Sequence, residues 1–417
     1  MLSVPSSSSV ERWLLQRILS ATGNAPLRAV FKGSAGVSPT AAPPVATFVI
    51  HDYATLARMA LNPEIGFGDG YAAGTVEVHG DLVEFLEASY RAWPDITRRG
   101  WLTKLAAGVM DRLRANTPQR SRENVHHHYD LNAAFYQRWL DEQMLYTCAY
   151  FPTPSATLEE AQTAKMDHVC RKLQLTPGET VVEAGCGWGA LALHMARHYG
   201  VHVKAFNLSH EQIAFARQRA RQEGLDGRVE FIEDDYRNIT GRYDAFVSVG
   251  MLEHVGLSHH PEMGAVIHRS IGPEGRGLLH FIGRNQPAPL SAWIRKRIFP
   301  GACAPTLAQA MAILGPWNFA VYDVENLRLH YARTIEHWLD RFERAVPEIS
   351  ADYDAEFVRA WRLYLAGSLI AFRVGTMQLF QITFAGSQCG RIPWTRAHLY
   401  GDGQSEQQDA KWIHAMS

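Results

Sequence analysis

The sequence predicts an α/β protein with a doubly wound, mostly parallel sheet and a small α+β unit in front of it. The first observation is the alternation of helix-like and strand-like stretches from residue 157 onward. The second is residues 180–189, TVVEAGCGWG, where four residues of strand character run into three glycines at alternate positions. A helix-like stretch at 190–197 follows at once. Such a turn brings backbone N–H groups against a ligand with no Cβ in the way, so we expect a ligand site there.

The N-terminal residues are expected to form the small unit. Ser9 is a suitable N-cap for a helix from Val10 to about Leu19. Further expected elements are strands at 27–31, 45–50 and 75–78 and a helix at 53–61. Residues 66–74, GFGDGYAAG, are expected to form a turn-rich segment. The unit holds no polar group suited to chemistry, so we expect it to pack, to dock on a membrane or to form a dimer contact.

The larger unit carries the rest of the alternation. Its expected strands lie at 180–184, 201–206, 228–232, 243–251, 277–282, 319–324 and 377–384. Its expected helices lie at 158–173, 190–199, 209–223, 261–270, 331–345 and 353–373, the third with Ser209 as N-cap and Gln212 at the capping-box position. These elements divide the chain into four expected parts. They are a small domain at 1–90, an arginine-rich linker at 91–122, a catalytic domain at 123–396 and a polar tail at 397–417.

Composition excludes some classes of protein. The chain has 417 residues, a net charge of -1 and 47% hydrophobic residues, which argues against a surface that coats nucleic acid. No run reaches the roughly 18 apolar residues of a membrane span. The five scattered cysteines form no CxxC pair, and residues 1–10 do not resemble a signal peptide, so we expect a cytoplasmic protein with reduced thiols. The histidines at 126–128 and 259–260 lack metal-ligand spacing, so no metal is expected.

The glycine spacing and the end of the second strand predict the class of ligand. Dehydrogenases of this architecture place an acid at the end of that strand, whereas this sequence has Asn207 there. The glycines occupy every second position and do not follow G-x-G-x-x-G. Both points disfavour a nicotinamide cofactor. The motif resembles the first motif of S-adenosylmethionine-dependent methyltransferases, which implies the class I methyltransferase fold and places Asp235 near the adenine.

Longer stretches resemble the cyclopropane-fatty-acyl-phospholipid synthases, a family related to the mycolic acid cyclopropane synthases. The resemblance extends from about residue 10 to residue 395. The stretches that carry it are 66–82, 128–136, 144–151, 185–189, 249–256, 279–283, 330–331 and 364–373. The resemblance implies an enzyme that transfers a methylene group from S-adenosylmethionine to a cis double bond of an unsaturated phospholipid acyl chain.

The chemistry of that reaction requires particular residue types. Methyl transfer to an alkene leaves a carbocation, which water would quench, and ring closure needs a base beside it in a dry pocket. The resemblance implies bicarbonate as this base, held by the backbone of Cys148, Glu253, His280, the backbone of Ile282, and Tyr331. It implies that the cofactor is bound by Tyr129, Tyr146, Thr147, Gly185, Gly187, Gly189, Asn207, Gln212, Asp235 and Tyr236. Ser368 stands where some relatives carry a cysteine, so no covalent thiol mechanism is expected.

Each catalytic candidate also has an ordinary structural interpretation. Glu253 follows a strand and can cap the next helix, and a lone histidine in an apolar strand such as His280 is more often structural than catalytic. Tyr331 at a helix start can be ordinary packing, and Cys148 in an aromatic segment would usually be buried and inert. Taken together and in this order, the residues favour the site.

Two segments suggest contact with a membrane. The linker at 91–122 is rich in arginine, and residues 289–300 interleave Trp293, Ile298 and other apolar residues with three cations. A solvated linker and a surface helix with an ordinary buried face are the alternatives. The expected partners are therefore an unsaturated phospholipid at the inner face of the membrane, with peripheral association, and a second copy in a homodimer; no nucleic acid is expected.

Three other functions stay open at this point. The same cation can give methyl-branched or methylene products by losing its proton elsewhere. A non-catalytic lipid-binding protein could keep the fold, although it would have no reason to keep a charged cleft. A small-molecule methyltransferase would not need the N-terminal unit or the 289–300 segment.

Overall fold

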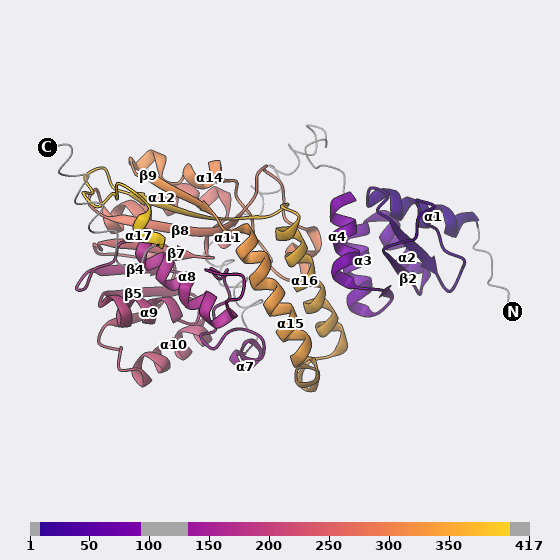
Figure 1. The fold of residues 1–417 in the computed structure, drawn as a ribbon, viewed down its shortest axis with the longest axis horizontal. Coiled ribbons are helices and arrows are strands. Elements are labelled where there is room, and N and C mark those ends of the chain that lie inside the picture. Colours follow the sequence, from indigo (N-terminus) through magenta and orange to yellow (C-terminus); the bar gives the residue numbers. More distant parts are fainter. Residues whose placement is uncertain (1–8, 93–131, 401–417) are drawn as a thin grey trace.

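The computed structural model describes residues 9–92 and 132–400, which form two units (Figure 1). The small N-terminal unit lies at one end of the molecule and the large α/β unit at the other. Helices α15 (Arg328–Asp352) and α16 (Ala355–Arg373) stand between them as an antiparallel pair. The doubly wound α/β fold with a small N-terminal α+β unit is confirmed.

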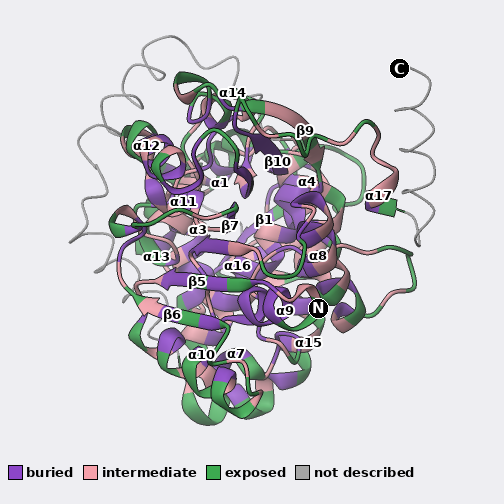
Figure 2. Ribbon diagram, turned by 90° about the vertical axis from the view of Figure 1, so that its left-hand side faces the viewer, coloured by how far each residue is buried: buried purple, intermediate pink, exposed green. Residues whose placement is uncertain are grey.

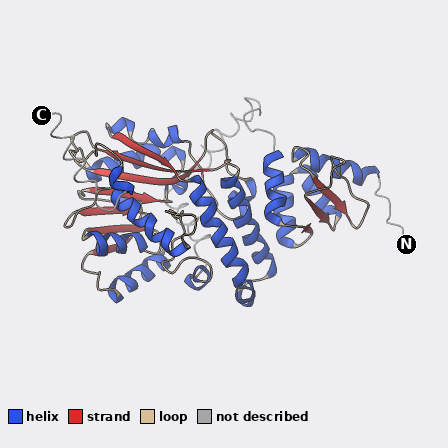
Figure 3. Cartoon of the chain, viewed as in Figure 1, coloured by secondary structure: helices blue, strands red, loops and turns tan. Residues whose placement is uncertain are grey.

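A seven-stranded sheet organises the large unit (Figure 3). Its order is β6-β5-β4-β7-β8-β10-β9, and β10 runs antiparallel to both of its neighbours. The chain leaves β4 toward β5 and later returns to its other side at β7, so the order reverses at β4. Open α/β sheets bind ligands at such a reversal, outside the carboxyl ends of the strands. The strands are β4 (Thr180–Ala184), β5 (His202–Asn207), β6 (Val229–Glu233), β7 (Ala245–Val249), β8 (Arg276–Gly283), β9 (Ala320–Asn326) and β10 (Gln378–Ala385).

Helices cover both faces of this sheet, which explains why its central strands are buried almost throughout and are mostly apolar (Figure 2). Val181 packs in one buried cluster with residues of three helices, and its neighbour Val182 packs in another. The first cluster includes residues of α8 (Leu158–Lys172), α9 (Ala190–Tyr199) and α10 (His210–Gln222). The second includes residues of α12 (His260–Ile271) and α14 (Leu307–Met311).

Most predicted elements of the large unit lie within a few residues of their expected bounds. The largest difference is α15, which starts before the expected residue 331 and continues through Pro347 to Asp352. The capping box expected at the start of α10 is half formed. Ser209 accepts from the Gln212 N–H, but the Gln212 side chain accepts from Asn207 instead of returning to the cap.

The small unit has a three-stranded sheet of order β1-β2-β3 packed against helices. The expected helices and strands are confirmed, and residues 82–92, for which no element was expected, form helix α4. Residues expected to form a turn-rich segment form helix α3 instead. The elements are α1 (Ser9–Ala21), β1 (Leu27–Phe31), β2 (Ala46–Ile50), α2 (Tyr53–Leu61), α3 (Pro63–Ala73), β3 (Val76–His79) and α4 (Leu82–Ala92).

The glycines of α3 are sites of close packing, which is why composition misled the prediction. A Cβ on Gly66 would lie 2.6 Å from the backbone of Met59, and one on Gly68 would lie 2.4 Å from the ring of Trp293. The ends of the helix carry ordinary signals: Asn62 caps it and Gly74 ends it in the left-handed conformation. Helix α3 is therefore a docking helix whose small residues let other elements approach.

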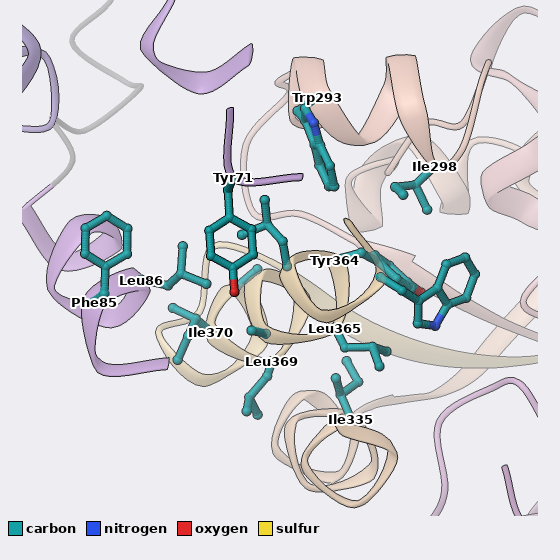
Figure 4. Packing of buried hydrophobic residues seen from close by; sticks show 14 of the residues in the cluster. Tyr71, Phe85, Leu86, Trp293, Ile298, Ile335, Tyr364, Leu365, Leu369 and Ile370 are labelled. Carbon is teal, nitrogen blue, oxygen red and sulfur yellow. The ribbon is translucent and has the colours of Figure 1, made fainter. Parts of the chain in front are cut away.

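Helices α3 and α4 dock on α16 (Figure 4). Tyr71 and Leu86 lie beside Leu369 and Ile370 in one buried cluster. The Arg359 Nε donates to the carbonyl of Ala72 at 2.7 Å. The two units are thus joined by a continuous apolar core rather than by a polar contact alone.

Helix α13 (Ala292–Arg297) belongs to the same junction, which corrects the expectation of a membrane segment at 289–300. Trp293 is 5% exposed and lies against Gly68, and Ile298 is also buried. Arg297 pairs with Asp69 of α3 at 2.8 Å. The alternative, a helix with an ordinary buried face, is the one observed, because these apolar side chains fill the space between the units.

Parts of the predicted linker and tail lie outside the described residues. Arg91 belongs to the last turn of α4 and pairs with Glu87, whereas the linker after residue 92 is not described. The expected tail begins with a helical turn, α17 (Ala397–Tyr400), whose Leu399 is buried. Among the described helices, none has the length and apolar character needed to cross a membrane.

We predict that Gly68→Ala destabilises the fold by about 1–3 kcal/mol, because the added methyl would overlap the Trp293 ring. Gly367→Ala is the matched control, since it also lies inside a helix but a Cβ there would meet nothing within 4 Å. That control should be neutral or stabilising by up to about 1 kcal/mol. Chemical denaturation measures both. Equal stability of the two variants would contradict the close contact.

Candidate active site

A pocket lies at the carboxyl ends of β4, β5 and β6, where the sheet order reverses. It brings together most of the residues predicted for the cofactor. Gly189 does not line it, and Tyr129 falls outside the described residues. The predicted residues that line it are Tyr146, Thr147, Gly185, Gly187, Asn207, Gln212, Asp235 and Tyr236.

The glycine turn between β4 and α9 shapes this pocket. A Cβ on Gly185 would lie 2.8 Å from Met251, and one on Gly189 would lie 2.7 Å from Phe231, so both glycines are needed for packing behind the turn. Gly187 differs, because it has φ +52° and a Cβ there would meet nothing within 4 Å. Its backbone faces open space that a ligand can approach closely, which fits a nucleoside-bearing ligand.

Asn207 ties the glycine turn to α10. Its Nδ2 donates to the Gly187 carbonyl at 3.3 Å and to Gln212 Oε1 at 2.6 Å. Its Oδ1 accepts from the Leu208 N–H at 2.8 Å. The absence of an acid at this strand end therefore reflects a different role for the position, since an amide both donates and accepts there.

Asp235 and Tyr236 follow β6 on the other side of the pocket. The Asp235 carboxylate accepts from the Arg237 N–H at 2.9 Å and from Arg237 Nη1 at 3.0 Å, which holds it rigid. The Tyr236 hydroxyl is buried without a hydrogen-bond partner among the described residues. Burial raises the pKa of this phenol, so it stays protonated and can donate to a ligand.

Lys165 and Glu183 also line the pocket, and the sequence analysis did not single them out as site residues. Lys165 Nζ donates to Thr147 Oγ1 at 2.9 Å, and burial lowers the pKa of the ammonium to about 8. Glu183 is the second-last residue of β4, its Oε2 has no partner among the described residues, and burial raises its pKa to about 8. The sequence feature that could have identified Lys165 is its position, because it falls on the buried stripe of α8 with Ala161 and Val169.

A second cluster forms around Glu253, in α11 (Leu252–Val255) just after β7. Its Oε1 accepts from the Ile282 N–H at 2.5 Å, whereas its Oε2 is buried with no described partner. Burial raises the pKa of Glu253 to about 7. This carboxyl therefore sits near the midpoint of its titration at neutral pH, as a group that exchanges protons would.

His280 and Tyr331 lie in elements that adjoin Ile282. His280 Nδ1 is 3.0 Å from Gln381 Nε2, and burial lowers the pKa of the imidazole well below its usual value, so the ring is neutral. Tyr331 N donates to Leu327 O, and Leu327 N donates to the carbonyl of Leu379, the residue paired with Ile282 across β8 and β10. The sheet register therefore places these side chains in one neighbourhood.

Cys148 reaches the same neighbourhood from the loop before α8. Its Sγ is 3.9 Å from the Leu327 carbonyl, and burial raises the pKa of the thiol, which makes it unreactive. No described residue accepts a hydrogen bond from the Cys148 N–H. The backbone donor, rather than the sulfur, is therefore the group available for a ligand.

Aromatic side chains form a wall behind the pocket, which Tyr146 lines; this aromatic wall comprises Tyr146, Tyr364, Trp139 and Trp338. The Tyr146 hydroxyl lies 2.7 Å from that of Tyr364, and the Tyr146 ring packs against Trp139 and Trp338. Helix α11 joins the two clusters, because His254 lines the glycine-turn pocket while Glu253 faces Ile282. No described group of three His, Cys, Asp or Glu side chains has the geometry of a metal site.

The strand order with one antiparallel strand, together with the pocket at the glycine turn, defines a class I S-adenosylmethionine-dependent methyltransferase. The comparisons give the family. Residues 116–382 match the family model described as mycolic acid cyclopropane synthetase, and the chain belongs to that family of lipid methyltransferases. The resemblance on which the sequence analysis relied is thus confirmed.

Individual relatives agree with this assignment. The "Probable fatty acid methyltransferase" of Pseudomonas putida is 36% identical over 80% of this chain and 86% of its own length. The "Cyclopropane-fatty-acyl-phospholipid synthase" of Escherichia coli (strain K12) is 41% identical over 62% of this chain and 66% of its own. The structure of mycolic acid cyclopropane synthase CmaA1 complexed with SAH and CTAB aligns with a TM-score of 0.60 and 30% identity, over 63% of this chain and 97% of that one.

We predict that Glu253 makes stability depend on pH. Because its folded pKa of about 7 lies above the ordinary 4.5, the stability is fully present below pH 4.5 and is lost as pH rises through 7. The loss is about 3 kcal/mol at most. Glu253→Gln should remove this part of the pH dependence, measured by denaturation in bicarbonate-free buffers.

The matched control for this measurement is Glu230→Gln, an exposed carboxylate on β6. It should keep the wild-type pH profile. Parallel profiles for wild type and Glu253→Gln would show that Glu253 titrates normally and would contradict the effect of its burial.

Proposed function

We propose that the protein transfers a methylene group from S-adenosylmethionine to a cis double bond of unsaturated phospholipid acyl chains and so forms a cyclopropane ring. The observation that carries the proposal is the buried Glu253 carboxyl, with one oxygen unpartnered among the described residues, across α11 from the glycine-turn pocket. A simple methyl transfer to nitrogen or oxygen needs no base that reaches the transferred methyl group itself. Ring closure does, because a proton must leave the newly added carbon.

The residues of the glycine-turn pocket fit the methyl donor. Gly187 gives the close backbone approach, Asp235 lies at one side, and Thr147 is hydrogen-bonded to Lys165 in the middle of α8. When bound, S-adenosylmethionine supplies an electrophilic methyl group on a sulfonium. The protein's own part is to hold this group facing the acyl chain and to keep water out.

The aromatic side chains support the cationic intermediate on the acyl chain. Tyr146 lines the pocket with Trp338 and Tyr364 packed against it, and aromatic faces attract positive charge. The same side chains exclude water, which would otherwise add to the cation. An alkene carbon that has accepted the methyl group can then persist until the proton is removed.

Bicarbonate is proposed as the base, and the chemistry of the donor set supports it. The Cys148 N–H and the neutral His280 are hydrogen-bond donors suited to an anion, whereas the Ile282 N–H already donates to Glu253 Oε1 at 2.5 Å. Bicarbonate would supply an oxygen base that takes the proton from the added methyl group. Glu253 would orient it by accepting its O–H, and Tyr331 would complete the set.

The alternative product is a methyl-branched or methylene chain. The same methyl transfer gives the same cation, which then loses a different proton, directly or after a hydride shift along the chain. The relative from Pseudomonas putida named as a fatty acid methyltransferase favours this outcome. The two outcomes differ only in where the base meets the cation.

We expect lipids incubated with the protein and S-adenosylmethionine to gain one CH₂ on monounsaturated chains, measured by mass spectrometry. Proton NMR should show the upfield signals of a cyclopropane. Vinylic or branched-methyl signals would establish the alternative, and no mass gain would reject both. Glu253→Gln should lower turnover by about 10²-fold or more because the base loses its orienting group, with SAH binding kept.

The control for the last variant is again Glu230→Gln, which should turn over like the wild type. Removal of bicarbonate should lower the wild-type rate, and added bicarbonate should restore it. A rate that does not respond to bicarbonate would contradict its role as the base while leaving the product assignment untouched.

Peripheral association with an anionic bilayer is proposed through the small unit. Helices α1 and α2 face away from α16 (Figure 1) and expose large apolar side chains, with Trp13 57% and Leu61 82% exposed. Lys32 Nζ lies 4.2 Å from the Tyr53 ring, and the Arg17 guanidinium lies over Trp13. We define the α1–α2 patch as Val10, Trp13, Arg17, Lys32, Tyr53 and Leu61. Aromatic residues beside cations suit an anionic lipid surface.

Replacing both Trp13 and Leu61 by serine should weaken binding to phosphatidylglycerol vesicles by about tenfold, since burial of both side chains in the interface would be lost. Vesicle flotation measures this binding. The control is Trp394→Ser, which replaces another exposed tryptophan. Unchanged flotation would reject the patch as the docking surface. A change in molecular mass by light scattering, without a change in flotation, would assign the patch to the expected homodimer instead.

A further inference from the structure

Lys165 is a buried cation without an anionic partner. It is 1% exposed, and its ammonium makes one hydrogen bond among the described residues, to Thr147 Oγ1 at 2.9 Å. No described carboxylate lies within the 4.0 Å of an ion pair with it. An ammonium has three donors, so this group is left with unused capacity at the wall of the pocket.

Such an arrangement is costly unless a ligand completes it. A buried charge without a partner costs several kcal/mol, and proteins normally pair it. The two nearby acids, Asp141 and Glu183, do not supply the missing anionic partner. Asp141 accepts from the N–H groups of Gln143 and Leu145, and burial raises its pKa, while burial also raises the pKa of Glu183.

Lys172 shows what a structural lysine looks like in the same helix. It lies two turns further along α8, is likewise buried at 2% exposed, and pairs with Glu325 at 2.6 Å. His168 adds a second contact to the same carboxylate at 2.7 Å. The fold thus supplies an acid for Lys172 and supplies none for Lys165, which alone of the two faces the pocket.

Helix α8 also fixes the loop that carries Thr147. Gln162 Nε2, one turn before Lys165, donates to the carbonyls of Leu145 and Thr147 at 3.3 and 3.0 Å. Met144 at the start of this loop has φ +62°, which is uncommon outside glycine. The Lys165 ammonium and the Thr147 hydroxyl are therefore held together before any ligand arrives.

We propose that Lys165 and Thr147 form an anion subsite of the glycine-turn pocket, which takes the α-carboxylate of the methyl donor. The carboxylate is the one anionic group of S-adenosylmethionine, and Lys165 is a cation that lines the pocket. Asp235 lies on the opposite side, so the amino-acid part of the donor points toward α8 and the adenosine part toward β6. Glu183 Oε2 is an unpartnered acceptor near the first end, where the donor's ammonium would lie.

The inference rests on the methyl donor of the proposed function and not on the ring it forms. It is tested by binding alone, with SAH and 5′-methylthioadenosine, which lacks the amino-acid part. Lys165→Met should weaken the binding of SAH by about tenfold or more and should change the affinity for methylthioadenosine by no more than about twofold. Calorimetry on the full chain measures both, so a failure of cyclopropane formation would not affect the outcome.

Lys172→Met is the matched control, because it removes a buried lysine from the same helix without touching the pocket. It should leave the ratio of the two affinities unchanged. Equal loss of both ligands in Lys165→Met, or no loss of SAH, would overturn the subsite. Should Lys165→Met fail to fold, Thr147→Val removes the hydroxyl that holds the ammonium and should weaken SAH selectively; an unchanged ratio there would also overturn it.

Discussion

The turn from β4 into α9 is the constraint on which the rest of the site depends. Gly185 lets Met251 approach to a distance that any side chain would block, and Met251 immediately precedes α11. The position of α11 in turn sets Glu253 on one side and His254 on the other. A single backbone turn therefore fixes both the donor pocket and the acid–base cluster, and it fixes the distance between them.

Buried charges around this turn fall into two kinds. Although burial opposes it, hydrogen bonds from His168 and Lys172 lower the pKa of Glu325 to about 2, so that carboxylate is permanently ionised and stabilising. Lys165 and Glu253 lack such partners, and burial moves their pKa values toward neutrality. The fold thus pairs Glu325 with Lys172 and, at the pocket, Asp235 with Arg237, but it leaves Lys165 and Glu253 without an ion pair among the described residues, as expected where ligands complete them.

The sequence predicted the sheet well because alternation and glycine spacing are local patterns. It predicted α3 wrongly because a glycine-rich helix and a glycine-rich turn have the same composition. Only the contact of Gly68 with Trp293 distinguishes the two. Lys165 was missed for a related reason. The sequence shows a lysine on a buried stripe, but only the structure shows that this lysine has no anionic partner among the described residues. Tyr331 and Cys148 were named from resemblance. Their nearness to Glu253 depends on the register of β10 against β8, which no local pattern contains.

The small unit is part of the site's construction as well as a neighbour. One face of α16 packs Leu369 and Ile370 against the small unit, while Tyr364 of the same helix meets Tyr146 in the aromatic wall. Phe299, which follows α13, packs edge-on against Tyr364, and α13 itself rests on Gly68. A displacement of α3 would therefore reach the aromatic wall through two routes. In the proposed mechanism this wall excludes water from a cationic intermediate, so the N-terminal unit contributes to that mechanism through packing, even though it supplies no reacting group.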